Sequence, residues 1–400
     1  MTVPSETVAH TSSDRRMWPL YAAGFTTAFG AHAVAANLGG FSEDAVKSLL
    51  TLGLLLAVYD GAEVLLKPLF GTIADRIGAR PVLLAGLVGF AVASATYVVA
   101  DSPGWLWAAR LGQGAAASAF SPAASALVAR LNPGSKHGRA FGSYGFYKSI
   151  GYTLGPLLGG ALVWLGGFRL LFVVLTVLGL AVAVWAMLAV PAVPPLPRAR
   201  QTVVDLARRL SDPAFLSPTA SLAGATAALS VGVGFLPVTG AAAGLGTIAT
   251  GAAVSVLAAT GALVQPRAGR ALDTGRLSTR AGITTGLLLA AAGLGWATLP
   301  GILGVLLAAV FIGLGTGLIT PLGFAALAAS TPEARLGQTM GSAEVGRELG
   351  DAGGPLLVAG VASVAALSYG YATLAVILAV GPIAGLVISS TPRRRKHQRS

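Results

Sequence analysis

Long apolar runs separated by short polar loops fill this sequence almost from end to end. Each run holds about 20 nearly uncharged residues, the length that an α-helix needs to cross the hydrocarbon core of a bilayer. The runs lie at residues 17–37, 46–68, 81–100, 104–130, 139–164, 168–190, 214–236, 245–265, 280–299, 301–329, 336–364 and 369–390. The pattern predicts an all-α membrane protein with twelve transmembrane helices.

Composition indicates the same class of protein. Of 400 residues, 54% are hydrophobic and 10% are charged, and a soluble protein of this size could neither bury so much apolar surface nor stay dissolved with so few charges. Glycine and proline recur inside the runs, which membrane helices tolerate because neighbouring helices satisfy freed backbone groups and small residues allow close packing. The lipid bilayer is therefore the expected surrounding of the chain.

Positive charge is concentrated in alternate loops. The basic residues of these loops are Arg15, Arg16, Arg76, Arg80, Arg130, Lys136, Arg139, Arg198, Arg200, Arg208, Arg209, Arg267, Arg270, Arg276, Arg280, Arg393, Arg394, Arg395 and Lys396. By the positive-inside rule, we expect a multi-pass protein of the cell (inner) membrane with both termini in the cytoplasm. The net charge of +12 follows mostly from this topology. It gives no support for nucleic-acid binding, which needs a basic face on a soluble domain.

One segment of the chain is written twice. Residues 133–143 recur as 332–342, Gly155-Pro156 recurs as Gly354-Pro355, and Lys148 falls on Arg347, all at an offset of 199 residues. A period of this length is too large for a solenoid unit and indicates two fused halves. In a membrane protein, such halves are typical of a secondary transporter.

The repeat and the loops together predict the domain organisation. We expect a cytoplasmic tail at 1–16, a six-helix bundle at 17–190, a cytoplasmic linker at 191–213, a second six-helix bundle at 214–390 and a basic cytoplasmic tail at 391–400. Within the linker, residues 202–210 place Val203, Leu206 and Leu210 on one helical face. This pattern predicts a short amphipathic helix on the cytoplasmic leaflet.

Three motifs carry a resemblance to a known family. Residues 71–80, GTIADRIGAR, strongly resemble the signature loop between the second and third helices of the major facilitator superfamily. Residues 106–114, LWAARLGQG, resemble its fourth-helix motif, and residues 151–160, GYTLGPLLGG, match its fifth-helix antiporter motif at every fixed position. Two departures are Ala79, where the family has a basic residue, and a first helix without the paired prolines of many drug/proton antiporters.

The resemblance implies two pseudo-symmetric six-helix bundles that rock about a central cavity. It also implies a role for Arg110 in proton coupling, and its fifth-helix motif favours export. For conformational gating, we expect glycines that let helices approach closely and an acid, Asp75, that faces helix N-termini as a latch between the halves. The gating candidates are Gly71, Asp75, Arg76, Gly78, Arg80, Gly155, Pro156 and Asp273.

Ionisable residues within the predicted spans are the candidates for coupling and substrate binding, because each costs at least about 2.5 kcal/mol to insert. They are Asp60, Glu63, Arg110, Lys148, Glu344, Arg347, Glu348 and Asp351. The last four are spaced by three or four residues, so most share a helix face where Arg347 can neutralise one acid but not three. A carboxylate buried without a cation binds protons more readily than one in water.

Two interpretations of these charges stay open. Asp60 and Glu63 share a face, and repeat logic makes Arg110 and Lys148 their nearest cations, either in a structural ion-pair network or in a proton and substrate site. Lys148 also has a simpler interpretation as the counter-ion of one acid. Lys67 is expected to snorkel to the cytoplasmic interface.

Aromatic residues and one histidine are candidates for the lining of an amphipathic cavity, although ordinary packing is an alternative for them. They are His32, Tyr59, Tyr147 and Tyr152. Without cysteine, no disulfide or thiolate metal site can form. No phosphate-binding loop, zinc-protease motif or nucleophile elbow is present in a suitable setting, so we expect no enzyme, no cofactor and no metal.

These observations predict a monomeric secondary active transporter whose partners are protons, a small organic substrate such as a drug, and the bilayer. The expected activity is proton-coupled export by alternating access. An alternative is uptake or facilitated transport of a metabolite or organic anion, in which Arg110, Lys148 and Arg347 bind the substrate's charge. A nontransporting receptor on the same fold is a further alternative.

Overall fold

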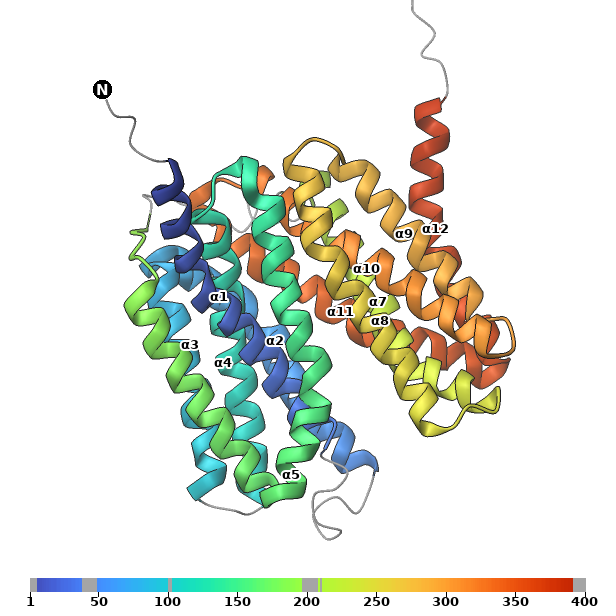
Figure 1. The fold of residues 1–400 in the computed structure, drawn as a ribbon, viewed down its shortest axis with the longest axis horizontal. Coiled ribbons are helices and arrows are strands. Elements are labelled where there is room, and N and C mark those ends of the chain that lie inside the picture. The colour runs from blue at the N-terminus through green and yellow to red at the C-terminus, as the bar shows by residue number, and fades with distance from the viewer. Residues whose placement is uncertain (1–5, 38–48, 100–102, 196–207, 209–210, 391–400) are drawn as a thin grey trace, which may run out of the picture.

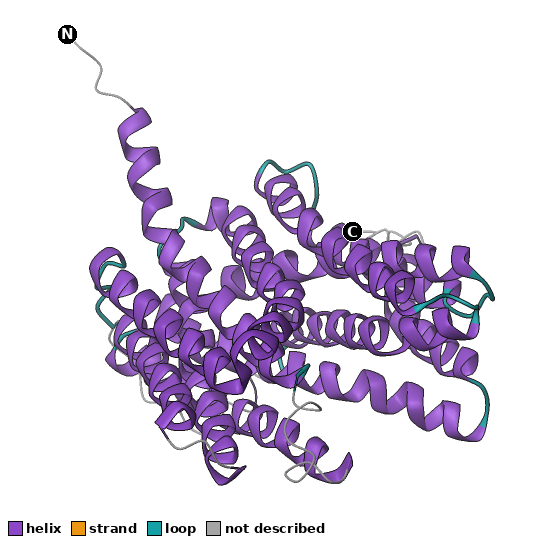
Figure 2. Cartoon of the chain, turned by 60° about the horizontal axis from the view of Figure 1, so that its bottom comes forward, coloured by secondary structure: helices purple, strands orange, loops and turns teal. Residues whose placement is uncertain are grey.

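Helices account for nearly all the secondary structure of the described residues (Figure 2). The structure is a computed structural model that describes residues 6–37, 49–99, 103–195, 208 and 211–390. The helices are α1 (Glu6–Ala35), α2 (Leu49–Ile77), α3 (Ala79–Val99), α4 (Pro103–Arg130), α5 (His137–Ala189), α7 (Pro213–Ala242), α8 (Thr247–Asp273), α9 (Thr279–Trp296), α10 (Ile302–Ser330), α11 (Leu336–Val364) and α12 (Leu367–Ser390). The all-α prediction is confirmed.

Helix α5 contains the fifth and sixth predicted spans. Its backbone leaves helical geometry at Gly166 (φ −157°, ψ 25°) and at Gly167 (φ +67°, ψ −174°), so the helix consists of two arms joined by a kink. The dihedral angles of Gly167 lie in a region that is open essentially only to glycine. The boundary that the sequence predicted near residue 166 is therefore a two-residue break.

Five helical stretches are long and apolar enough to cross a membrane by length and composition alone. Within the part of the chain that the structure describes, these are Ala79–Val99, Gly134–Ala189, Pro213–Ala242, Ala249–Asp273 and Ile302–Ser330. Large apolar side chains also face outward, among them Leu157 at 68% and Trp164 at 84% exposure. An apolar outer surface suits a protein surrounded by lipid.

The helices form two sets, one for each half of the chain (Figure 1). The larger apolar core lies in the first half and extends into α7, α10 and α11, whereas the smaller one lies in the second half. In the first half, α1 lies along α5 and α3 packs on α4, around buried residues such as Phe90 and Phe172. In the second half, α7 packs on α11, and α10 packs on α8 and α9, around Val231, Leu257 and Ile312. The bounds of the two bundles, 17–190 and 214–390, stay a prediction.

Contacts between the halves follow the repeat. Helix α2 packs on α11, and α5 packs on α8, which are corresponding pairs because α2 repeats as α8 and α5 repeats as α11. A short 3-10 turn precedes each of the long inner helices, at Gly134–Lys136 before α5 and at Glu333–Arg335 before α11. The predicted amphipathic segment 202–210, apart from Arg208, and the basic tail 391–400 lie outside the described residues.

Candidate functional site

A buried lysine lies at the centre of the charges between α2 and α11. The Nζ atom of Lys67 is 2.6 Å from Oε2 of Glu63, one turn earlier on the same helix, and 2.6 Å from Oε1 of Glu348 on α11. The same Nζ atom is 3.7 Å from Oε2 of Glu344. One cation of the first half therefore binds two acids of the second half. Lys67 is only 1% exposed, so bulk water does not reach it.

The expectation that Lys67 snorkels to the interface was therefore wrong. Residues four apart lie on the same helix face, which turns Lys67 toward Glu63, and α11 covers this face. A Cβ atom on Gly341 would lie 2.5 Å from the backbone carbonyl oxygen of Lys67, so only glycine lets α11 come this close. The cation paired with Glu63 is Lys67, whereas repeat logic had favoured Arg110 or Lys148.

Glu344 is the most deeply placed acid of the group. Its Oε2 atom lies 3.3 Å from Nη1 of Arg347, 3.7 Å from Nζ of Lys67 and 3.8 Å from Nζ of Lys148 on α5. The residue is 1% exposed, and its Oε1 atom has no hydrogen-bond partner within the described part of the chain. Three cations therefore surround one carboxylate oxygen.

Asp60 and Asp351 differ from the three glutamates because both are exposed. Asp351 accepts a hydrogen bond from the Ser230 hydroxyl of α7. Asp60 lies three residues before Glu63 on α2, on the same side of the helix. The two aspartates are thus the accessible members of the cluster, one from each half of the chain.

Acids outnumber bases in this cluster. Five carboxylates (Asp60, Glu63, Glu344, Glu348 and Asp351) face four cations (Lys67, Arg110, Lys148 and Arg347), which leaves one negative charge when every group is ionised. We define these nine residues as the ionic cluster. A single proton or one monovalent organic cation would bring it to neutrality.

Arg110 is the member of the ionic cluster that α4 contributes. The side chain is 1% exposed, and its guanidinium carbon lies 4.3 Å from the centre of the Tyr59 ring, in the geometry of a cation–π contact. A Cβ atom on Gly114 would lie 2.5 Å from the Tyr59 carbonyl oxygen, so glycine permits α4 to reach α2. The Nε and Nη1 atoms of Arg110 have no hydrogen-bond partner among the described residues.

The cavity candidates fall into different environments. The rings of His32 and Tyr152 meet edge to face with centroids 4.4 Å apart, and Nδ1 of His32 lies 3.0 Å from the Ala28 carbonyl oxygen. Tyr59 lies under Arg110, as described above. Tyr147 instead stacks on Tyr21 of α1 with centroids 5.0 Å apart, so its ring belongs to the packing between α1 and α5.

Two acids outside the ionic cluster join the halves at the end where α5 and α11 begin. The Asp75 carboxylate accepts hydrogen bonds from the amides of Gly337 (2.7 Å) and Gln338 (2.8 Å), at the start of α11. Asp273 accepts from the amides of Gly138 and Arg139, both at 2.8 Å, at the start of α5. A carboxylate at a helix N-terminus satisfies unpaired amides and the helix dipole, so each half holds the other in the same way.

Glycines allow these contacts. A Cβ atom on Gly71 would lie 2.3 Å from the Gly337 carbonyl oxygen, and one on Gly269 would lie 2.0 Å from that of Gly138. No other residue leaves room for such crossings. The closed end carries the loops that the positive-inside rule assigns to the cytoplasm, and Figure 1 shows the two sets of helices diverging toward the opposite end.

The other gating candidates have local roles. Gly78 adopts φ +101° in the turn between α2 and α3, and the Arg80 guanidinium donates to the Met187 carbonyl oxygen at 2.5 Å, near the end of α5. Arg76 is exposed. Gly155 lies against α1, where a Cβ atom would be 3.1 Å from the Phe29 carbonyl oxygen, and Pro156 is an exposed residue inside α5.

Known proteins resemble this chain in sequence and in fold. A family model described as the Major Facilitator Superfamily matches residues 20–350. The chain is 33% identical over 165 residues to a probable actinorhodin transporter of Streptomyces coelicolor, which is 40% of this chain and 27% of that protein. It is 43% identical over 94 residues to the puromycin resistance protein pur8 of Streptomyces alboniger, which is 23% and 18% of the two chains.

A third relative is the quinolone resistance protein NorA of Staphylococcus aureus, 29% identical over 109 residues, or 27% of this chain and 28% of the relative. The matched stretches thus span less than a third of these relatives' own lengths. Among solved structures, the human organic anion transporter MFSD10 has a TM-score of 0.79 at 19% identity and covers 93% of this chain and 99% of its own. FucP in the outward conformation has a TM-score of 0.78 at 14% identity, with 95% and 100% coverage.

Proposed function

The chain belongs to the major facilitator superfamily, and we propose that it is a proton-coupled exporter of small organic compounds that works by alternating access. The observation that carries this proposal is the ionic cluster, in which five acids and four bases come from both halves and three ion pairs cross the boundary between the halves. Relatives named for actinorhodin transport and for puromycin and quinolone resistance support an exporter of drug-like molecules.

Coupling follows from the position of Lys67. Its ion pairs with Glu344 and Glu348 tie α2 to α11, so the two helices separate only when these pairs break. Breaking a buried pair by removing one partner costs about 3–5 kcal/mol, because the other charge is left uncompensated. A proton on Glu348, which is the most exposed of the Lys67 partners with 20% of its side chain accessible, would weaken this tie.

The excess acid gives the cycle its direction. In the outward-facing arrangement, the exposed carboxylates of Asp60 and Asp351 take up a proton from the outside, and the cluster becomes neutral. A substrate that arrives from the cytoplasm then displaces the proton. Exchange of one proton for one monovalent cation moves no net charge, so the pH difference across the membrane drives it, by about 1.4 kcal/mol per pH unit. For an uncharged substrate, the charge of the proton also crosses the membrane potential, which contributes about 2.3 kcal/mol per 100 mV.

The latches at Asp75 and Asp273 define the other half of the cycle. Four hydrogen bonds from backbone amides to these two carboxylates close the end that we assign to the cytoplasm. This arrangement suits the outward-facing state. Opening to the cytoplasm requires both carboxylates to leave the helix N-termini. We further propose a monomer in the cell membrane with cytoplasmic termini and the two bundles bounded at 17–190 and 214–390.

The first prediction concerns transport by the purified protein in proteoliposomes. We expect efflux of a fluorescent organic cation to rise with an imposed proton gradient and to stop when an uncoupler is added. Glu348→Gln should lower this gradient-driven efflux at least about tenfold, since one such step corresponds to about 1.4 kcal/mol. Glu333→Gln, which changes an exposed acid in the loop before α11, is the matched control and should transport normally. Efflux with the same rate at every imposed gradient would contradict coupling.

Transport of an organic anion is the second candidate function. It is favoured by the unpartnered Nε and Nη1 atoms of Arg110 and by the unpartnered Nε atom of Arg347, counted among the described residues. A carboxylate ligand would satisfy these donors. Competition separates the candidates, because displacement of the probe by organic cations supports the first and displacement by carboxylates supports the second.

A further inference from the structure

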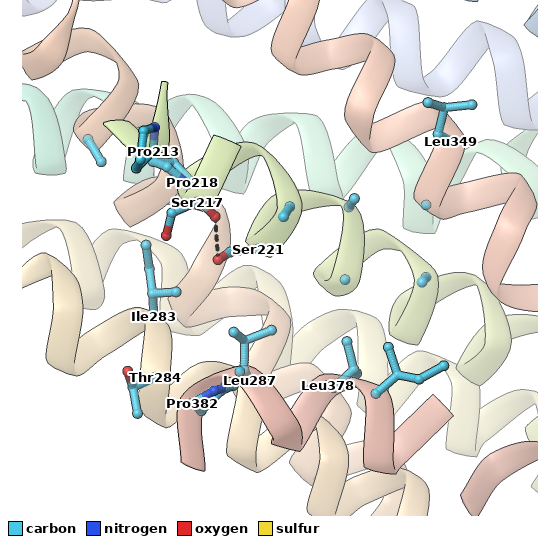
Figure 3. Close-up of a pocket in the computed structure, with 18 of the residues that line it drawn as sticks. Pro213, Ser217, Pro218, Ser221, Ile283, Thr284, Leu287, Leu349, Leu378 and Pro382 are labelled. Carbon is cyan, nitrogen blue, oxygen red and sulfur yellow. Dashed lines mark hydrogen bonds between the residues drawn. The ribbon is translucent and has the colours of Figure 1, made fainter. Parts of the chain in front are cut away.

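A groove separate from the ionic cluster lies in the second half of the chain. It has a volume of about 1000 Å³ and runs between α7, α9, α11 and α12, with the end of α10 at its edge (Figure 3). Most of its lining is small or apolar, as Figure 3 shows for Pro218, Leu287 and Leu378. No member of the ionic cluster lines it.

The groove exists because the repeat is broken at this place. A Cβ atom on Gly151 would meet the carbonyl oxygen of Phe25 at 2.6 Å, and one on Gly350, its counterpart 199 residues later, would meet that of Ala223 at 2.1 Å. The same comparison matches Phe29 with Ala227, through Gly155 and Gly354. Two stacked rings of α1, with centroids 5.5 Å apart, therefore correspond to two alanines that line the groove.

A third large side chain is missing on α11. Leu154 of α5 corresponds to Gly353 at the same offset, and Gly353 lines the groove. A Cβ atom on Gly353 would meet nothing within 4 Å, so no packing requirement accounts for this glycine. The second half thus carries two alanines and a glycine where the first half has three bulky side chains. The groove lies beside the outward-facing side chains of Leu349 and Ile377, which are 62% and 54% exposed.

One end of the groove is polar and basic. Thr279 and Arg280 from the first turn of α9 line it there, together with Ser330 from the last turn of α10. Ser278 caps α9 by accepting from the Ala281 amide at 3.2 Å. An arginine at a helix N-terminus is suited to a phosphate group, because both favour a negative charge.

We propose that this groove binds one anionic phospholipid of the inner leaflet, with an acyl chain along α7, α11 and α12 and its phosphate at Arg280. The arrangement matches such a molecule in order: an apolar body open to the hydrocarbon, then a cation and hydroxyl groups at the end that the charge pattern assigns to the cytoplasm. Basic pockets between membrane helices on the cytoplasmic side are known to bind anionic lipid headgroups.

Native mass spectrometry of the purified full-length protein tests this proposal. The chain would be titrated with phosphatidylglycerol and with phosphatidylcholine that carries the same acyl chains. We expect one phosphatidylglycerol to bind at least about fivefold more tightly than phosphatidylcholine, given the contribution of a single surface cation to anionic lipid binding. Arg280→Gln should abolish this preference, whereas Arg276→Gln, in the neighbouring loop outside the groove, should keep it.

Gly353→Leu restores the side chain that α5 carries and should weaken binding of both lipids. Gly360→Leu is its control on the same helix, because a Cβ atom there also meets nothing within 4 Å. Unchanged melting temperatures in lipid-free detergent verify that the variants fold. Equal binding of the two lipids by the parent protein, or an undiminished preference in Arg280→Gln, would overturn the proposal. A third outcome would also overturn it, namely that Gly353→Leu abolishes transport of a dye while phosphatidylglycerol still binds. The groove would then hold the transported compound and not the lipid.

Discussion

Lys67 illustrates at the residue scale how one side chain can link the two halves of a carrier. Its ammonium group donates to Glu63 on its own helix and to Glu348 on α11, both at 2.6 Å. A cation that is 1% exposed is stable there only because acids surround it. The contact between α2 and α11 and the proposed proton cycle therefore depend on the same few atoms.

The pair of Lys67 and Glu348 should behave non-additively in a double-mutant cycle. We expect Lys67→Met to lower the free energy of unfolding by about 3–5 kcal/mol, because it leaves buried acids without their cation. The double variant Lys67→Met/Glu348→Gln should lose less than the sum of the two single variants. Thermal unfolding in detergent measures each term.

Lys136→Met, an exposed lysine of the turn before α5, controls for the loss of a positive charge and should change the melting temperature little. Strict additivity of Lys67→Met and Glu348→Gln would show that the 2.6 Å contact contributes nothing to stability.

At the scale of the element, glycine decides which helices bend and which meet. The break in α5 depends on Gly167, and the crossings of α2 with α11 and of α5 with α8 depend on Gly71 and Gly269. In the first case the requirement is a backbone conformation, and in the others it is the absence of a Cβ atom. The two requirements make different predictions for substitution by alanine.

Gly167→Ala should destabilise the protein although a Cβ atom would meet nothing within 4 Å. Its backbone conformation, φ +67° with ψ −174°, is adopted essentially only by glycine, and it costs a residue with a Cβ atom about 1–3 kcal/mol. Gly360→Ala, inside α11 and equally uncrowded, is the control and should be neutral or stabilising. Thermal unfolding compares the two variants, and equal melting temperatures would show that the kink relaxes without cost.

At the scale of the whole molecule, two copies of one device hold the closed end. Asp75 binds the start of α11 and Asp273 binds the start of α5, each through two backbone amides. Since the same helices pass through the interface that carries the ionic cluster, opening one end changes the surroundings of the charges in the middle. The latches and the cluster are therefore expected to respond to each other.

Loss of one latch should open this end more often. The chain has no cysteine, so a single Met340→Cys, at a position that is 0% exposed near the start of α11, reports access without background. We expect Asp75→Asn to speed its alkylation several-fold, because an amide group lacks the charge that favours the helix N-terminus. A Ser211→Cys reporter, at an exposed position, should react equally fast in both backgrounds. An unchanged rate at residue 340 would show that Asp75 does not hold the closed end.

The sequence by itself determined the fold class and the family. The features that carried this prediction are local or periodic: apolar runs of membrane length, basic residues in alternate loops and a segment that recurs at an offset of 199 residues. They can be recognised without knowing which helices are in contact. The motif around Asp75 also indicated a helix N-terminus as its partner, because a carboxylate and unpaired amides attract each other wherever the fold allows it.

Only the tertiary structure decided how the charges pair. Lys67 was misassigned because its burial depends on α11, which is 281 residues from Lys67 at Glu348, and a spacing of four from Glu63 was the single local signal. The groove was missed for the same reason. The repeat matches Leu154 with Gly353, but only the contacts show that the space beside Gly353 is empty. Ion pairs and grooves depend on which helices lie side by side, and the linear pattern of residues does not specify this.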